Sequence, residues 1–170
     1  MSERERFDGH AKAHGLFFQG LIELNRCKTI VEIGVAHAST TKYLTQGAES
    51  VGGFVNGFDM WAPHGISNHY DQISSREKCD DYLKSQGLKS YSLTQINTAS
   101  PDFVARLDEL GPIDFAFIDG CHSYEGVRRD FDLVYPRLNT PGIIAFHDTL
   151  RIDGCRRMIM DLRTTLNDGT

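Results

Sequence analysis

The sequence predicts an α/β protein with a Rossmann-like parallel sheet, in the strand order 3-2-1-4-5, and with helices on both faces. Short β-branched and aromatic runs alternate with helix-like segments five times over, behind a leading helix. This alternation is typical of parallel strands joined by right-handed crossovers. The two most apolar runs, at 113–118 and 142–146, each end beside an acid and a histidine. Ligands of open α/β sheets bind beyond the carboxyl ends of the strands, so these two ends are the first candidates for a functional site.

Composition and charge restrict the class of protein. The 170 residues, 40% hydrophobic and 24% charged, are typical of one globular domain spanning 1–170. The net charge of -5, without a basic run, disfavours nucleic acid and anionic membranes and favours a small-molecule partner. No apolar stretch approaches the roughly 20 residues that cross a bilayer, and we expect a cytoplasmic protein. The four cysteines form no CxxC motif, and we expect three to be packing residues and Cys121 a bystander.

The N-terminal half is expected to begin with a helical segment, 1–25, in which residues 1–9 fray and the helix covers 10–25. The cofactor-binding core is expected at 29–149. Its first elements are a strand at 29–35, a helix capped by Ser39 or Thr40 and running to 47, and a strand at 51–59. The loop at 62–72 is either a lid over the substrate or a plain surface excursion.

The C-terminal half continues the alternation. Ser100 before Pro101 predicts a helix start. The expected elements are a helix from Ser74 or Ser75 to 87, strand 90–96, a helix from 101, strand 113–118, helix 124–138, a turn NTPG at 139–142, strand 142–146, and a last helix near 154–166 within 150–170.

The first strand and the turn after it indicate a nucleoside cofactor. Glu32, Gly34 and Ala36 lie where a dinucleotide-binding protein has its glycine-rich turn, and Asp59 follows 25 positions after Gly34. An acid at the end of the second strand can accept hydrogen bonds from both ribose hydroxyls. The alternative is that Glu32 caps the helix and Asp59 begins a turn.

The missing glycines favour a cofactor without phosphates. Ala36 stands where a second glycine would let the backbone touch a pyrophosphate, and Glu32 would repel phosphate but suit a cationic ammonium or sulfonium group. S-adenosylmethionine meets these requirements. Ala36 and the absence of a Tyr-x-x-x-Lys pair disfavour an NAD-dependent oxidoreductase.

Three motifs, VEIGVAHASTTKYL, GFDMW and IDFAFIDGCHSYEGVRRDFDLVYPRLNTPGIIAFHDT, resemble class I S-adenosylmethionine-dependent methyltransferases. The resemblance extends to the branch of metal-dependent O-methyltransferases that act on macrolide and aminocoumarin sugars. It implies that the cofactor lies along the carboxyl ends of the strands. The residues that it assigns to the cofactor are Glu32, Gly34 and Ala36 for the methionine part, Asp59 and Met60 for the ribose, Asn97, Thr98 and Ala99 near the adenine, and Asp119.

The acids and histidines that follow the strands at 113–118 and 142–146 are candidates for metal binding and catalysis. Asp119 and Asp148 are placed to share a divalent cation, and the resemblance implies that the acids at these positions bind magnesium. His147 stands where relatives have an acidic neighbour, and histidine shifts the preference from magnesium towards manganese, iron or zinc. Asp119, His147 and Asp148 are therefore the predicted ligands of magnesium or manganese. His122 is predicted to be the general base, with Asp119 as its catalytic companion, although it could instead only hold the loop.

The leading interpretation is an O-methyltransferase for a small sugar-like or phenolic molecule. The alternative is a non-catalytic S-adenosylmethionine-binding module, because Cys121 departs from the resembling family and the family's C-terminal antiparallel hairpin is lacking. A homodimer would cover the edge left by the fifth strand. Trp61 either covers the cofactor or acceptor or packs in the core. Four arginines are expected on solvated helix faces: Arg128, Arg129, Arg156 and Arg157.

Overall fold

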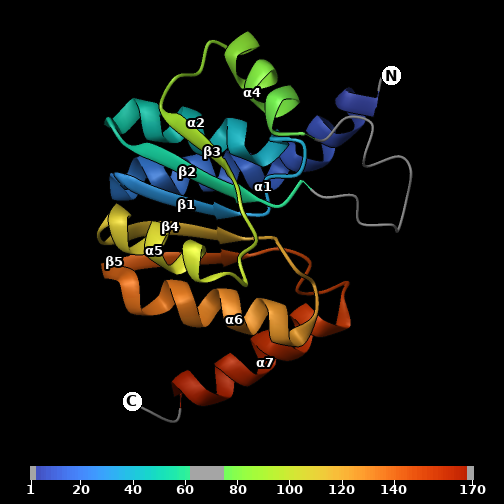
Figure 1. Ribbon diagram of the computed structural model, residues 1–170, viewed down its shortest axis with the longest axis vertical. Coiled ribbons are helices and arrows are strands. Elements are labelled where there is room, and N and C mark those ends of the chain that lie inside the picture. Colours follow the sequence, from blue (N-terminus) through green and yellow to red (C-terminus); the bar gives the residue numbers. More distant parts are fainter. Residues whose placement is uncertain (1–2, 62–74, 168–170) are drawn as a thin grey trace.

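A computed structural model describes residues 3–61 and 75–167 of the chain. Five parallel strands form one sheet in the order β3-β2-β1-β4-β5, which confirms the predicted fold class (Figure 1). No antiparallel strand follows β5 within these residues. The strands are β1 Thr29–Ile33, β2 Phe54–Asp59, β3 Tyr91–Gln95, β4 Ile113–Ile118 and β5 Leu138–Phe146. The helices are α1 Glu3–Asn25, α2 Ser39–Val51, α4 Arg76–Ser85, α5 Pro101–Leu110, α6 Tyr124–Val134 and α7 Asp153–Asn167, with a 3-10 turn, η1, at Tyr135–Arg137.

Helices α1, α2 and α4 cover one face of the sheet. Phe18 of α1 and Leu44 of α2 are buried against Phe115 and Phe117 of β4. The rings of Phe18 and Phe117 lie 5.0 Å apart. The alternation of side chains along β4 sends these two phenylalanines to the face that α1 and α2 occupy.

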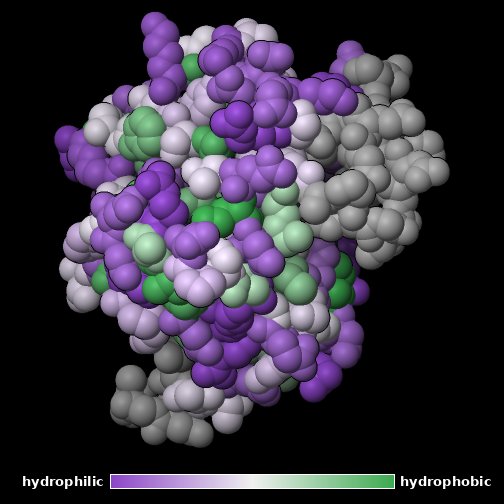
Figure 2. Space-filling view, in the orientation of Figure 1, coloured by the Kyte–Doolittle hydropathy of each residue, from purple (hydrophilic) through white to green (hydrophobic). Residues whose placement is uncertain are grey.

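Helices α5, α6 and α7 cover the opposite face (Figure 1). Phe103, Phe131 and Met158, one from each helix, pack in a single cluster with Ile118 of β4. The surface seen in Figure 2 is mostly hydrophilic, with small apolar patches between the helices. None of the helices in the described ranges is long and apolar enough to cross a membrane.

Helix α1 begins at Glu3, so the prediction of a frayed segment before His10 was wrong. Tertiary contacts hold the first turns. The Asp8 carboxylate accepts hydrogen bonds from the Ser39 hydroxyl at 2.8 Å and from the Tyr82 hydroxyl at 2.9 Å. These bonds tie the polar start of α1 to α2 and α4, and no local periodicity could predict them.

Two element boundaries around α2 also differ from the prediction. Ala38, in a left-handed conformation, is the N-cap in place of the expected Ser39 or Thr40. Helix α2 continues to Val51, where the predicted strand would begin, because Gly52 with φ 72° forms its C-cap. Strand β2 therefore begins only at Phe54.

The chain between α6 and β5 was predicted as helix and then as a turn. Helix α6 ends at Val134, since Pro136 follows within η1, and β5 already begins at Leu138. Leu138 pairs with Ile113, whereas the next pair along β4 joins Phe115 to Ile143. The NTPG segment is therefore an irregular part of the edge strand.

Candidate functional site

The turn after β1 packs directly on the end of β4. Gly34 has φ 92°, and a Cβ atom at this position would lie 2.2 Å from the Asp119 carbonyl oxygen. Its N–H donates to the Phe58 carbonyl at 2.8 Å, and the Asp119 N–H donates to the Ile33 carbonyl at 2.8 Å. Only glycine combines this conformation with so close an approach, so the position fixes the turn against the β4 end.

Asp59 is anchored to the same turn by backbone donors. Its Oδ2 accepts from the Ala36 N–H at 2.8 Å and its Oδ1 from the Trp61 N–H at 2.7 Å. The Trp61 indole N–H donates in turn to the Ala36 carbonyl at 3.2 Å, so Trp61 closes this side of the turn. Met60 is exposed and its carbonyl accepts from the Gln95 amide at 2.8 Å. Each Asp59 oxygen keeps a lone pair with which it could accept a ribose hydroxyl.

Glu32 lies within β1 rather than in the turn, and it is fully buried. Its carboxylate oxygens make no hydrogen bond within the part of the chain that the structure describes. Burial raises its pKa well above the usual range, the nearby Thr41 hydroxyl offsets this in part, and the charges of Asp119 and Asp59 raise it further. This position agrees with the predicted strand at 29–35, and strand alternation sends the side chain beneath the turn, towards Thr41 of α2.

The predicted adenine-side residues form the turn between β3 and α5. The Ile96 N–H donates to the Asp59 carbonyl at 2.8 Å, which places this turn beside the end of β2. Within the turn, the Asn97 side-chain oxygen accepts from the Ala99 N–H at 2.9 Å. The Thr98 hydroxyl accepts a hydrogen bond from Arg129 of α6 at 2.9 Å.

Two acids and two histidines meet at the ends of β4 and β5. His122 Nε2 lies 3.3 Å from Asp119 Oδ1 and 3.8 Å from Asp148 Oδ2. His147 Nδ1 lies 3.2 Å from Asp119 Oδ1 and 3.4 Å from Asp148 Oδ2. We call these four residues the acid–histidine cluster. The structure thus brings together all the residues that the sequence singled out at these strand ends.

The cluster is electrostatically coupled. The hydrogen bond to Asp119 raises the pKa of His122, and the interaction with the same carboxylate raises the pKa of His147. Burial alone would raise the pKa of Asp119, but the two histidines outweigh burial and lower it. The arrangement therefore favours an ionised Asp119 beside histidines that bind protons more readily than usual.

The donor set fits a divalent cation. Asp119, His122 and Asp148 each offer one ligand atom, all within 4.8 Å of one another. The sequence predicts His147, and not His122, as the third metal ligand. His147 approaches the same two carboxylates. Oxygen and imidazole donors in one set suit manganese, iron or zinc better than magnesium.

The local chain holds His122 and Asp148 in place. Ser123 caps α6 by accepting from the Gly126 N–H at 3.0 Å, and the Cys155 thiol of α7 lies 3.8 Å from the His122 carbonyl. Asp148 has φ 53°, a left-handed conformation that is uncommon outside glycine and recurs at functional sites.

His14 of α1 is part of the site, although sequence reasoning did not select it. Its ring lies edge-on to His147 with centroids 5.1 Å apart, and its Nε2 lies 3.0 Å from the Thr40 hydroxyl. Burial lowers the pKa of His14, His147 lowers it further, and Asp119 offsets part of this shift. A lone histidine on a helix carries no motif, so only the packing of α1 on the sheet reveals it.

The four arginines differ in the acids that they pair with. Arg128, Arg156 and Arg157 pair with exposed acids, as expected. Arg129 is itself 36% exposed, close to the 39% of Arg128, but it pairs with Asp130, whose side chain is fully buried. Arg129 also reaches the β3–α5 turn, where it donates to the Thr98 hydroxyl at 2.9 Å.

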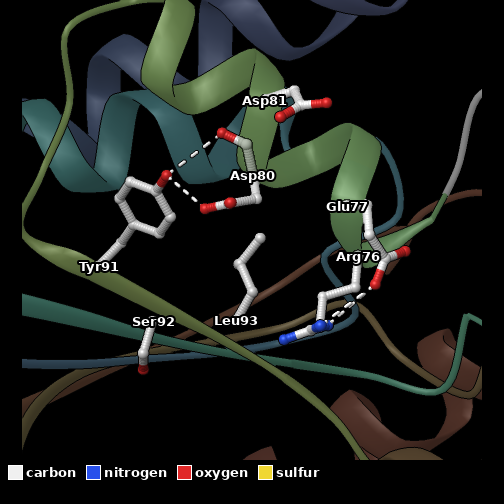
Figure 3. A pocket seen from close by; sticks show the side chains of 7 residues that line it. All are labelled: Arg76, Glu77, Asp80, Asp81, Tyr91, Ser92 and Leu93. Atoms are coloured by element: carbon white, nitrogen blue, oxygen red, sulfur yellow. Dashed lines mark hydrogen bonds and ion pairs between the residues drawn. The ribbon is translucent and has the colours of Figure 1, made fainter.

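An open pocket of about 290 Å³ lies between α4 and β3, formed by residues outside the cluster (Figure 3). The Tyr91 hydroxyl donates to Asp80 Oδ1 at 2.8 Å, and Arg76 pairs with Glu77 at 3.2 Å. These charges are paired with each other, and nothing in the pocket points to a ligand.

The sheet order, the glycine turn and the acid at the end of β2 define an α/β protein of the nucleoside-cofactor-binding class. Residues 31–149 match the family model described as a methyltransferase domain, and the chain belongs to this family. The predicted class I methyltransferase is thereby confirmed. No curated protein sequence matches the chain.

Solved structures of methyltransferases share the fold. An O-methyltransferase from Bacillus cereus, in complex with SAH, has a TM-score of 0.70 at 18% identity, covering 89% of this chain and 69% of its own. TomG of Streptomyces achromogenes, an O-methyltransferase involved in tomaymycin synthesis and in complex with SAM, has a TM-score of 0.67 at 15% identity, covering 89% and 68%. Cofactor-bound Rv0187 from MTB has a TM-score of 0.71 at 17% identity, covering 93% and 74%.

Proposed function

We propose that this chain transfers the methyl group of S-adenosylmethionine to an oxygen of a small hydroxylated molecule, with the help of a divalent cation. The observation that carries the proposal is the set of acids around the Gly34 turn. Asp59 and Asp119 flank the turn and the buried Glu32 lies beneath it, without a hydrogen-bond partner in the described ranges. Carboxylates in this arrangement stabilise a cationic sulfonium and ammonium and repel phosphate, and Glu32 contributes to this when it is ionised.

The cofactor would lie across the ends of β1, β2 and β3. When bound, S-adenosylmethionine supplies an electrophilic methyl group on sulfur. Asp59, held by two backbone N–H groups, is positioned to accept from the ribose hydroxyls. The turn that contains Asn97, Thr98 and Ala99 lies beside Asp59 and would border the adenine. Ala36 would border the methionine part.

The acid–histidine cluster would serve the acceptor. In methyl transfer the acceptor oxygen bonds to the methyl carbon while the carbon–sulfur bond breaks, and a base must take the hydroxyl proton. His122 is exposed enough to meet an acceptor, and its raised pKa makes it a stronger base than a free histidine. Asp119 orients it and stabilises the imidazolium that forms.

The metal would be held by Asp119, His147 and Asp148. When bound, a divalent cation lowers the pKa of an acceptor hydroxyl. His122 could instead be a ligand, since its nitrogen lies within the same donor set. The two roles exclude each other, because a nitrogen bound to metal has no lone pair for a proton.

The structural neighbours only partly support the proposal that the methyl group is transferred to an oxygen atom. The Bacillus cereus and Streptomyces proteins are O-methyltransferases. A precorrin-6y C5,15-methyltransferase from Geobacter metallireducens also shares the fold, with a TM-score of 0.62. The fold alone therefore does not select the acceptor, and the proposal of a hydroxyl rests on the acid–histidine cluster.

The test is methyl transfer from labelled S-adenosylmethionine to a panel of sugars and phenols, with manganese or magnesium present and again after EDTA. We expect a labelled product that EDTA abolishes and added metal restores. A product that forms equally well in EDTA would contradict the role of the metal. Cofactor binding without product on the panel or in a metabolite extract would favour the alternative, a non-catalytic cofactor-binding module.

A further inference from the structure

Helix α6 carries an ion pair that connects two turns of the site. We propose that Arg129 and Asp130 are positioning residues, which hold the β3–α5 turn in register with the turn after β4 so that both can border the adenosyl group. The proposal rests on the proposed function, because it gives these residues a role in cofactor binding. Neither residue touches the acid–histidine cluster, although both lie within the third sequence motif, in the run YEGVRRD at 124–130.

Arg129 makes the connection to the β3–α5 turn. Its Nη2 donates to the Thr98 hydroxyl at 2.9 Å and to Asp130 Oδ1 at 3.0 Å, while its Nε lies 3.2 Å from the same oxygen. The guanidinium is thus fixed at two nitrogens by the carboxylate and presents Nη2 to Thr98. A planar fork held in this way positions a hydroxyl more rigidly than a flexible ammonium would.

Asp130 makes the connection to the turn after β4. Its side chain is fully buried, and its Oδ2 has no hydrogen-bond partner among the described residues. This oxygen lies 3.3 Å from the position that a Cβ of Gly120 would occupy, so it faces the backbone that follows Asp119. Burial raises the pKa of Asp130, and the charge of Arg129 offsets part of this shift, so the buried carboxylate depends on Arg129 for its pairing.

A neighbouring ion pair on the same helix provides the contrast. Arg128 Nε lies 2.9 Å from both carboxylate oxygens of Asp132, one turn along α6, and both side chains are exposed. An exposed pair of this kind contributes little to stability. The two arginines are about equally exposed, but Asp130 is buried whereas Asp132 is exposed, and only Arg129 contacts the β3–α5 turn.

The consequence for the cofactor follows from the hydrogen bonds between the turns. The β3–α5 turn is joined to Asp59 through the Ile96 N–H, and Gly120 is joined in sequence to Asp119. If Arg129 released Thr98, this turn would lose the 2.9 Å hydrogen bond that holds the Thr98 hydroxyl to α6. Loose positioning by even about 1 Å weakens recognition and catalysis strongly.

The experiment measures SAH affinity by calorimetry, together with the melting temperature of the ligand-free protein, on the full chain. Thr98→Val removes the hydroxyl with little change of shape, and we expect SAH to bind about tenfold more weakly, about 1.4 kcal/mol. Thr98→Ser keeps the hydroxyl and should bind SAH as the wild type does. The melting temperature of both variants should stay within about 2 °C of the wild type, because an exposed turn contributes little to the core.

Arg129→Lys extends the test, and Arg128→Lys is its matched control. We expect the first to weaken SAH binding about as much as Thr98→Val does, and the second to leave it unchanged. Unchanged SAH affinity in Thr98→Val and Arg129→Lys, with the wild type binding normally, would overturn the inference and leave the proposed function standing. A weaker affinity that appears only with an equal loss of stability would also overturn it. A wild type that binds no SAH would overturn both.

Discussion

Two regions lie side by side at the carboxyl ends of the strands, but they are built differently. One is the cofactor end, by which we mean Glu32, the turn at Gly34 to Ala36, and Asp59. The other is the acid–histidine cluster. At the cofactor end the backbone does the positioning: Gly34 approaches the Asp119 carbonyl, and the N–H groups of Ala36 and Trp61 hold Asp59. In the cluster, side chains from β4, β5 and their following turns hold one another, and His14 packs against them from α1. The first region is therefore fixed by backbone contacts between strand ends and the second by side-chain packing.

This difference predicts which changes affect one region and which affect both. A change in the backbone at Gly34 should disturb both ends, because the turn and the β4 end share one contact. A change in a cluster side chain other than Asp119, which also flanks the Gly34 turn, should leave the cofactor end intact. The predictions below test this separation, beginning with the largest expected effect.

Gly34→Ala should disturb both regions. The added Cβ would lie 2.2 Å from a backbone oxygen at a positive φ, so we expect a loss of about 3 kcal/mol or more of folding stability and no measurable SAH binding. Gly87→Ala is the control, since Gly87 also has a positive φ, 77°, but open space around it. It should lose only about 1 kcal/mol. Equal effects of the two substitutions in urea unfolding would refute the close approach.

Asp148→Asn should disturb the cluster alone. Loss of one anionic donor should weaken manganese binding about tenfold to a hundredfold, whereas SAH affinity should change less than about twofold. Calorimetry with each ligand separates the two effects. Comparison of His147→Asn with His122→Asn then identifies the ligand: the true ligand loses metal affinity, and the base loses turnover with metal affinity retained. A parallel loss of SAH affinity in Asp148→Asn would show that the regions are not separable.

Glu32→Gln should separate the charge of the cofactor end from its shape. The sulfonium of SAM is cationic and SAH is neutral, so the substitution should weaken SAM about threefold to tenfold more than SAH. In the wild type, SAM should bind more tightly as pH rises, because burial raises the pKa of Glu32 and only its ionised form attracts the cation. This dependence should vanish in the variant. Identical losses for SAM and SAH would contradict the electrostatic role.

The same raised pKa has a consequence for stability. A buried acid whose pKa is raised on folding stabilises the protein only while it is protonated, so its contribution is lost as pH rises above the unfolded value towards the folded one. Glu32→Gln should therefore be more stable than the wild type at neutral pH and should lose part of the pH dependence in thermal unfolding. A variant that is less stable at neutral pH would show that the carboxylate is well paired.

His14→Ala should have the smallest effect. The substitution removes an edge contact that steadies the His147 ring, and we expect manganese to bind about threefold more weakly. His10→Ala, at an exposed position one turn earlier on α1, is the matched control and should change nothing. If both variants bind manganese as the wild type does, α1 does not contribute to the cluster.

The sequence predicted most of what local chain geometry fixes. Strand β4, the Gly34 turn and Asp59 followed from apolar runs, a glycine and the spacing of an acid. The same reasoning failed where tertiary contacts decide: α1 starts at Glu3 because Asp8 bonds to other helices, and Arg129 joins α6 to Thr98 of the β3–α5 turn.

The cluster was partly predictable for the same reason. Asp119 and Asp148 could be found because both follow buried strands, and parallel strands end at the same edge. His14 could not, since its position depends on how α1 lies across the sheet. The full burial of Glu32 could not be predicted either, because a sequence pattern does not show which helices pack over a strand residue.

The most direct test of the account is a calorimetric titration of the full chain with SAH, alongside Asp59→Asn. We predict one SAH per chain, bound about tenfold more weakly by Asp59→Asn because the ribose loses a charged acceptor. Asp81→Asn, which changes an exposed acid on α4, should bind SAH as the wild type does. No heat of binding and no rise in melting temperature with SAH, in a wild type that unfolds cooperatively, would contradict the central claim that the Gly34 turn and Asp59 form an adenosyl site.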